Sequence, residues 1–132
     1  INYRCGTGHS VSFVGNVHEG PHALNGRNTT LMRPGMIVTD EPGVYETDLV
    51  GIRIENELVC VHKADNQYGT FLGFEPIMFV PIATSPIVPG VLTKDELDWL
   101  NNYHRQVFEK LAPRLNDEER EWLAKKCAAI GC

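Results

Sequence analysis

Two histidines and a glutamate lie close together in the stretch His18–Glu19–Gly20–Pro21–His22. The spacing matches the H-E-x-x-H signature of zinc peptidases, in which both histidines bind one zinc ion and the glutamate is the base. That geometry requires a helix, because residues four apart share one helical face. Glycine costs about 1 kcal/mol and proline about 3 kcal/mol in a helix interior, so Gly20 and Pro21 oppose it. We therefore expect a loop here and reject a zinc-binding helix.

Glu41 and Glu55 are a second group that could do chemistry. Glu41 ends a predicted strand and Glu55 lies in the next one, so antiparallel pairing of these strands would direct both carboxylates into one pocket. Buried carboxylates need cations nearby, because an unpaired buried charge is unfavourable. Arg53 could supply that charge, and so could a metal ion. The alternatives are two solvated glutamates, or a simple ion pair between Glu55 and Arg53.

A short glycine motif, Gly6–Thr7–Gly8, comes directly before His9. Glycines allow two backbone segments to approach closely, so the motif could place an imidazole in the same half of the chain as the two carboxylates. A G-x-G pattern by itself is only a weak indication of phosphate binding. A simple turn is the alternative interpretation.

Strands are expected to position these residues. Alternation of side chains predicts a strand over residues 36–41, which follows a Pro-Gly turn, and a second strand over 51–61. A third extended segment is expected over 70–82, where prolines favour an edge or irregular strand.

Helices are expected in the last third of the chain. A capping box at Thr93–Glu96 begins one helix, and Pro113 ends it. A second, shorter helix is predicted to begin at Asn116 and to stop near Gly131. The helical positions that we expect to face a core are Leu97, Leu100, His104, Val107, Leu111, Trp122, Leu123, Cys127 and Ile130.

The composition is typical of one soluble globular domain, with 132 residues, of which 42% are hydrophobic and 22% charged. A net charge of −5 argues against nucleic acid or an anionic membrane as a partner. The four cysteines form no C-x-x-C pair, so we expect reduced thiols and a cytoplasmic location. The chain begins at Ile1 without a methionine, and we expect it to be part of something longer.

Several stretches together resemble one known family: CGTGHSVSFVGNVHEGP (5–21), LMRPGMIVTDEPGVYE (31–46) and GIRIENELV (51–59). In this order and spacing they resemble the C-terminal half of the catalytic domain of the Xaa-Pro aminopeptidase (aminopeptidase P) family. That family belongs to the pita-bread superfamily with prolidase, methionine aminopeptidase and creatinase. Residues 73–82 and 92–123 are similar to the C-terminal extension of its larger members.

The resemblance implies an α+β fold, namely half of a pita-bread domain with a curved antiparallel sheet, followed by C-terminal helices. Residues 1–82 would form the catalytic part, and residues 83–132 the helical extension.

The resemblance also implies a site for two divalent metal ions, held by two aspartates, one histidine and two glutamates. By position, His9 corresponds to the metal-binding histidine, Glu41 to the first glutamate and Glu55 to the bridging glutamate. His18 corresponds to a second active-site histidine, which lines the substrate pocket and takes part in proton handling. Arg53 corresponds to a buried arginine near the substrate that positions carboxylates. This oxygen-rich ligand set suits Mn²⁺, with Co²⁺ or Zn²⁺ as alternatives.

Two features differ from the family pattern. Cys5 and Ser10 stand where many relatives have histidine and glycine. The two aspartates are expected upstream of Ile1, so the separate chain is expected to bind metal weakly and to lack peptidase activity.

The expected substrates are peptides with proline at the second position, and the expected assembly is a homodimer. The alternative is a non-catalytic pita-bread module that serves in binding or dimerisation.

Overall fold

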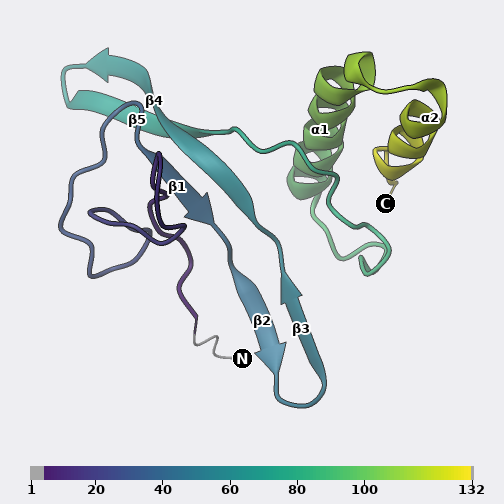
Figure 1. The fold of residues 1–132 in the computed structure, drawn as a ribbon, viewed down its shortest axis with the longest axis horizontal. Helices are drawn as coiled ribbons and strands as arrows, with labels where there is room; N and C mark the ends of the chain where they lie inside the picture. Colours follow the sequence, from purple (N-terminus) through teal and green to yellow (C-terminus); the bar gives the residue numbers. More distant parts are fainter. Residues whose placement is uncertain (1–4, 132) are drawn as a thin grey trace. The chain divides into compact units, whose positions relative to one another are not determined.

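The computed structural model describes residues 5–131 and divides the chain into two compact units, with the boundary between Met78 and Phe79. The first unit contains the strands and the second contains the helices (Figure 1). Strands and helices that follow one another in separate runs make an α+β architecture, as predicted. None of the helices within residues 5–131 is long and apolar enough to cross a bilayer.

The first unit has two antiparallel sheets in its described part. One sheet has the order β1–β4–β5, and the other pairs β2 with β3. The strands are β1 (Ile37–Asp40), β2 (Gly43–Glu46), β3 (Val50–Arg53), β4 (Asn56–Asn66) and β5 (Gly69–Pro76). The predicted strand over 51–61 is thus interrupted at Ile54 and Glu55, and β2 is an element that the alternation does not reveal. The third predicted segment is confirmed as an edge strand, β5, which ends at Pro76.

The two sheets follow one continuous register. β1 pairs with β4, so that Asp40 faces Asn56, and the pairing of β2 with β3 continues the same alignment. Glu41 and Glu55 therefore occupy facing backbone positions in the gap between the sheets. The backbone thus places the two glutamates on adjacent antiparallel segments, as predicted.

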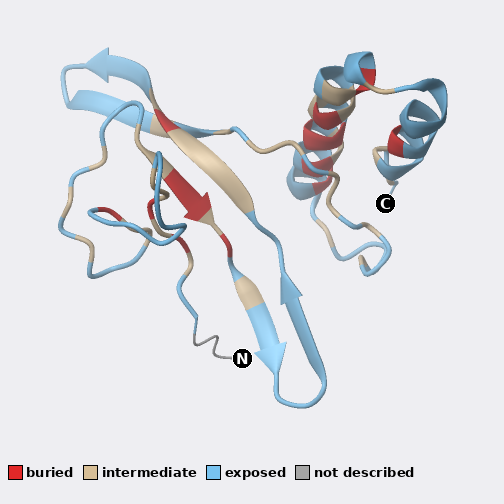
Figure 2. Cartoon of the chain, viewed as in Figure 1, coloured by how far each residue is buried: buried red, intermediate tan, exposed pale blue. Residues whose placement is uncertain are grey.

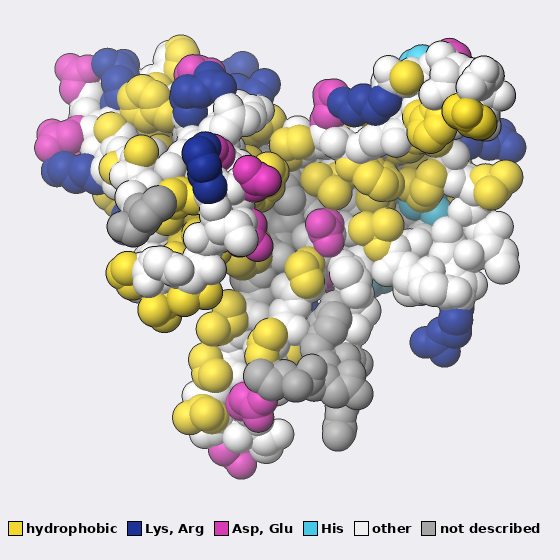
Figure 3. Space-filling view, turned by 180° about the vertical axis from the view of Figure 1, so that it is seen from behind, with side chains coloured by type: hydrophobic (Ala, Val, Ile, Leu, Met, Phe, Trp, Pro, Cys, Tyr) yellow, Lys and Arg dark blue, Asp and Glu magenta, His cyan; other side chains and the backbone are white. Residues whose placement is uncertain are grey.

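The buried part of the first unit is small, and it lies around β1 (Figure 2). Val38 on β1 and Cys60 on β4 are almost completely buried. Large apolar side chains are exposed on the other strands, and they include Val44, Tyr45, Val50, Ile52, Phe71, Leu72 and Phe74. Hydrophobic side chains gather over the β2–β3 hairpin at the bottom of Figure 3. Exposed apolar surface of this kind commonly contacts another polypeptide.

Both predicted helices are present in the second unit, as α1 (Lys94–Leu111) and α2 (Asp117–Lys126), with a short 3-10 turn at Ala112–Arg114. The capping box of Thr93 with Glu96 begins α1, and a similar box of Asn116 begins α2. Two helix predictions are wrong. α2 stops at Lys126 and not near Gly131, because the Asn101 side chain binds both backbone groups of Ile130 and draws the tail off the helical path. Trp122 is 56% exposed, because the face that α2 buries is the one that carries Leu123.

The core of the helical unit forms around Tyr103, Val107 and Leu123. The extended segment before α1 is fastened to it by side chains of the helix. The Tyr103 hydroxyl accepts a hydrogen bond from the Val80 amide and donates one to the Val80 carbonyl. At the next helical residue, Nε2 of His104 accepts a hydrogen bond from the Ile82 amide at 3.1 Å. These bonds hold residues 79–82 on α1.

His104 makes the stability of the helical unit sensitive to pH. The side chain is fully buried, and this burial lowers the pKa of His104 from its ordinary value of 6.5. The folded state therefore holds the neutral ring, whereas the unfolded chain binds a proton as the pH falls below about 6.5. The unfolded state then binds more protons than the folded state, so stability is lost on acidification.

We expect the denaturation midpoint of the helical unit to fall between pH 7 and pH 5, and the fall to be smaller in His104→Gln, which keeps a hydrogen-bond acceptor but cannot titrate. Trp99 and Trp122, the two tryptophans of the sequence, both lie in this unit, so their fluorescence reports its unfolding. An equal fall in both proteins would contradict the assignment to His104.

Candidate metal centre

Gly8 allows the segment that carries His9 to lie directly against β1. The Thr39 amide donates to the His9 carbonyl at 2.9 Å, and the Glu41 amide donates to the Thr7 carbonyl at 2.7 Å. A Cβ atom at position 8 would collide with the carbonyl oxygen of Thr39, whereas one at Gly6 would meet nothing. The close approach expected from the glycine motif therefore depends on Gly8.

The opposite side of this segment is held by residues 22–24. The Ser10 amide donates to the His22 carbonyl at 3.1 Å, and the Leu24 amide donates to the Gly8 carbonyl at 3.0 Å. Nε2 of the buried His22 ring lies 2.7 Å from the Ile37 carbonyl oxygen. Residues 18–22 form no helix, so the loop that Gly20 and Pro21 predict here is confirmed. His22 acts instead as a structural contact to β1.

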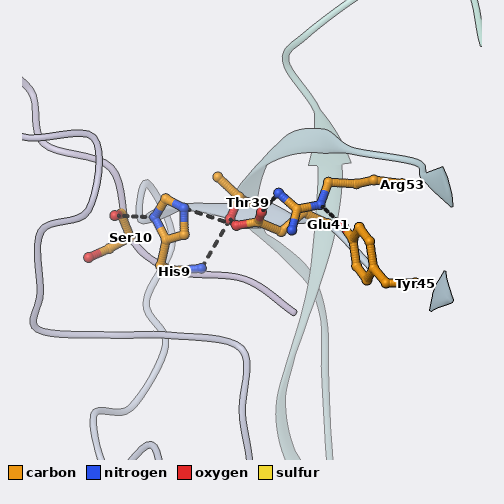
Figure 4. Close-up of polar contacts among 6 residues, drawn as sticks. All are labelled: His9, Ser10, Thr39, Glu41, Tyr45 and Arg53. Carbon is orange, nitrogen blue, oxygen red and sulfur yellow. Dashed lines mark hydrogen bonds and ion pairs between the residues drawn. The ribbon is translucent and has the colours of Figure 1, made fainter. Parts of the chain in front are cut away.

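His9 and Glu41 form the centre of the site (Figure 4). Nε2 of His9 lies 3.0 Å from Oε1 of Glu41, and Nη1 of Arg53 lies 2.9 Å from Oε2. Glu41 is only 7% exposed, so these contacts compensate a charge that is largely removed from water. Each carboxylate oxygen thus faces a different nitrogen-bearing side chain.

Arg53 is fixed from two directions. Its Nε donates a hydrogen bond to the Tyr45 hydroxyl at 2.7 Å, and its Nη1 contacts Glu41. The bond to Tyr45, with smaller contributions from the charges of Glu41 and Glu55, raises the pKa of Arg53. The guanidinium therefore remains charged at any working pH. The side chain is exposed among the described residues, and not buried as the resemblance implies.

The His9 ring faces an oxygen atom with each of its nitrogens. Nδ1 lies 3.0 Å from the Ser10 carbonyl oxygen, and Nε2 lies 3.0 Å from Glu41 Oε1. A neutral ring that donates from Nδ1 would direct the lone pair of Nε2 at a carboxylate oxygen. Only a doubly protonated ring, or a cation between Nε2 and Oε1, satisfies both contacts. The contact therefore fits an ion pair, and it equally fits two ligands of one metal ion, because imidazole nitrogen and carboxylate oxygen both bind divalent metals.

The two remaining predicted residues behave differently. The exposed His18 ring lies beside His9, with 4.2 Å between the ring centroids. Glu55 is exposed, and its backbone faces that of Glu41. Among residues 5–131, no group of three or more His, Cys, Asp or Glu side chains is arranged to hold a metal ion. The structure therefore brings together His9, Glu41, Arg53 and His18, and does not add the Glu55 carboxylate as a third ligand.

Two residues of the site were missed by the sequence interpretation. Thr39 hydrogen-bonds to both His9 and Glu41, and Tyr45 holds Arg53. The sequence does contain a signal for Thr39. It precedes Glu41 by two positions in the strand predicted over 36–41, and residues two apart on a strand point to the same face. Tyr45 lies on β2, which the alternation pattern did not reveal, and so had no such signal.

Two sequence-family models match the chain. Residues 1–62 match metallopeptidase family M24, and residues 70–130 match the C-terminal region of peptidase M24. The chain belongs to metallopeptidase family M24. The first match covers most of the strand-rich unit, and the second covers most of β5 together with the helical unit. The resemblance and the partial pita-bread α+β fold predicted from the sequence are confirmed.

Known relatives agree with the M24 assignment. Aminopeptidase P2 of Arabidopsis thaliana is 46% identical over 93% of this chain and 18% of its own length. A probable Xaa-Pro aminopeptidase P of Coprinopsis cinerea is 41% identical over 98% of this chain and 22% of its own length. The chain thus spans about a fifth of the length of these relatives.

A solved structure shares the fold. It is the X-prolyl aminopeptidase of Caenorhabditis elegans, described as a cytosolic enzyme with a di-nuclear active site. The match has a TM-score of 0.82 and 39% sequence identity, and it covers 95% of this chain and 21% of that one.

Proposed function

We propose that this chain supplies one histidine and two glutamate ligands to the dinuclear metal site of an aminopeptidase that hydrolyses the N-terminal Xaa-Pro bond of peptides. The observation that carries the proposal is the contact of 3.0 Å between His9 Nε2 and Glu41 Oε1, on a carboxylate that is largely buried. The names of the relatives support the choice of reaction.

In this proposal His9, Glu41 and Glu55 would hold the metal ions. A change of side-chain rotamer at Glu55 would turn its carboxylate towards the facing Glu41. The remaining ligands are two aspartates, which are expected from a polypeptide segment outside residues 5–131. One imidazole among carboxylates is a hard donor set, which favours Mn²⁺ over metals that prefer thiolates, with Co²⁺ or Zn²⁺ as alternatives.

The chemistry that two bound divalent ions supply is activation of a water molecule and polarisation of the scissile carbonyl. The residues of this chain orient the reacting groups. Arg53 holds Oε2 of Glu41 and leaves Oε1 turned towards His9. The exposed imidazole of His18, next to His9, can hydrogen-bond to the substrate and exchange a proton at the peptide bond.

The proposed substrates are peptides with proline at the second position, and the proposed location is the cytoplasm. The C. elegans enzyme is described as cytosolic, which supports the location.

The 132-residue chain alone should bind Mn²⁺ weakly and leave a Xaa-Pro peptide uncut, because its described residues provide too few ligands for a closed site. Isothermal calorimetry with Mn²⁺ and a peptide-cleavage assay measure both properties. Tight binding of two ions by the chain, or turnover, would contradict this expectation.

The positive test of the function is a chimera, in which this chain replaces the matching segment of Arabidopsis thaliana aminopeptidase P2. We expect the chimera to cleave a Xaa-Pro peptide when supplied with Mn²⁺, and to leave a matched Xaa-Ala peptide largely intact. A folded chimera that binds the metal but has no activity would refute the catalytic role.

A second candidate function is a non-catalytic module for binding or dimerisation, and the exposed apolar side chains of β2, β3 and β5 favour it. The same surface supports the proposed homodimer, which light scattering of the chain would detect. Glutamine substitutions in the chimera distinguish the two functions. The enzyme requires Glu41 and Glu55, whereas a binding module would tolerate glutamine at both positions.

A further inference from the structure

The hydroxyl group of Thr39 contacts both residues of the metal pair. It accepts a hydrogen bond from the His9 amide at 3.0 Å and donates one to Oε1 of Glu41 at 3.0 Å. Oε1 is also the carboxylate oxygen that faces the His9 ring. One oxygen atom of Thr39 thus joins the backbone of one proposed ligand to the coordinating atom of the other (Figure 4).

The surroundings of Thr39 make this contact rigid. The residue is only 2% exposed, so water does not compete for its hydroxyl group. Its amide binds the His9 carbonyl, so the backbone and the side chain both hold the same segment. Arg53 binds the other carboxylate oxygen of Glu41. With a donor on each oxygen, the carboxylate plane cannot rotate without losing a hydrogen bond.

We propose that Thr39 is a positioning residue for the metal site, one that sets the direction in which Glu41 Oε1 and the His9 ring face a shared cation. This inference rests on the proposed function, because it assumes that His9 and Glu41 bind a metal ion. Oε1 has a further lone pair for the metal while it accepts the hydrogen bond from Thr39. Hydrogen bonds that orient metal ligands typically contribute 10–100-fold to metal affinity.

A purely structural role would have a different consequence. In that case the hydroxyl group would serve only to pair the His9 amide, and its loss would weaken the docking of the loop without a specific effect on metal binding. Thr39→Val keeps the shape of the side chain and removes the hydroxyl group. Thr39→Ser keeps the hydroxyl group and removes the methyl group, so it is the matched control.

The experiment uses the 132-residue chain and Mn²⁺ as the probe. Paramagnetic broadening of the His9 ring resonances in NMR spectra gives the affinity at this site, even where binding is weak. Hydrogen exchange of the Thr39 amide reports whether the segment is still docked, since that amide binds the His9 carbonyl in the wild type and is present in every variant. If Thr39→Val undocks the segment, the smaller Thr39→Ala replaces it in the comparison with Thr39→Ser.

We expect Thr39→Val to weaken Mn²⁺ binding at His9 by about 10-fold or more, with the Thr39 amide still protected, and Thr39→Ser to bind within a few-fold of the wild type. Equal Mn²⁺ affinity of Thr39→Val and the wild type overturns the role of Thr39 and leaves the metal site intact. His9 resonances that do not respond to Mn²⁺ in the wild type overturn the metal site itself, and the role of Thr39 with it.

Discussion

Replacement of Glu41 by glutamine is expected to reduce Mn²⁺ affinity at His9 by at least the 10–100-fold that loss of an outer-shell partner produces. The amide is the same size as the carboxylate and can still accept the hydrogen bond of Thr39. It carries no negative charge, however, so it neither attracts a divalent cation nor compensates Arg53. In the chimera with the Arabidopsis thaliana relative, the same substitution should remove most Xaa-Pro cleavage.

Glu46→Gln is the matched control, because Glu46 is an exposed glutamate on β2 with no contact to His9 among the described residues. It removes the same charge from the same unit, and we expect wild-type affinity and activity. Mn²⁺ broadening of the His9 ring resonances and a peptide assay on the chimera provide the two measurements. The proposed metal site is refuted if Glu41→Gln and Glu46→Gln behave alike in both.

Replacement of Gly8 by alanine is expected to separate the His9 segment from β1. The new methyl group would collide with the Thr39 carbonyl oxygen and crowd the Leu24 side chain. Both obstacles are close to backbone, which cannot move aside as the end of a flexible side chain can. Overpacking of this kind typically destabilises by about 1–3 kcal/mol. Here the backbone hydrogen bonds of the His9 carbonyl with the Thr39 amide, and of the Thr7 carbonyl with the Glu41 amide, would be lost as well.

Gly6→Ala provides the control, because a methyl group at position 6 meets no atom within 4 Å. Hydrogen exchange of the Thr39 amide at increasing urea concentration follows the strand-rich unit, and tryptophan fluorescence follows the helical unit alone. We expect Gly8→Ala to lower the urea midpoint of the strand-rich unit and to leave that of the helical unit nearly unchanged. A Gly8→Ala protein as stable as Gly6→Ala, with normal protection of the Thr39 amide, would show that the close approach is not needed.

Local rules predicted the helical part well, because a capping box specifies a helix start within a few residues of sequence. Thr93 and Asn116 begin their helices as expected. The end of α2 was missed, since it depends on a contact between Asn101 and Ile130 that is distant in sequence. A helix cap can be predicted from neighbouring residues. The path of the residues after α2 cannot, because it depends on a contact with α1.

The sequence indicated which residues lie at the candidate site better than it indicated the contacts between them. The order of the motifs indicated His9, His18, Glu41 and Arg53, which the structure brings together. Alternation over 51–61 suggested one straight strand and so did not reveal the interruption at Glu55. A break in a strand leaves the alternation of hydrophobic residues almost unchanged, so the sequence pattern does not show it. The position of the break depends on the strands that pair with β3 and β4, and these lie elsewhere in the chain.

The shared register of the two sheets has a consequence for chain-length variation in this family. A residue inserted between Glu41 and β2, or between β3 and Glu55, would turn one carboxylate to the opposite side of the ribbon. The tip of the hairpin, where Asp48 adopts a left-handed conformation with φ of 56°, lies beyond that alignment and can be lengthened without changing it. Natural insertions, and epitope tags or fluorophores attached by the experimenter, should therefore be tolerated at the tip and excluded from the few residues nearest the two glutamates.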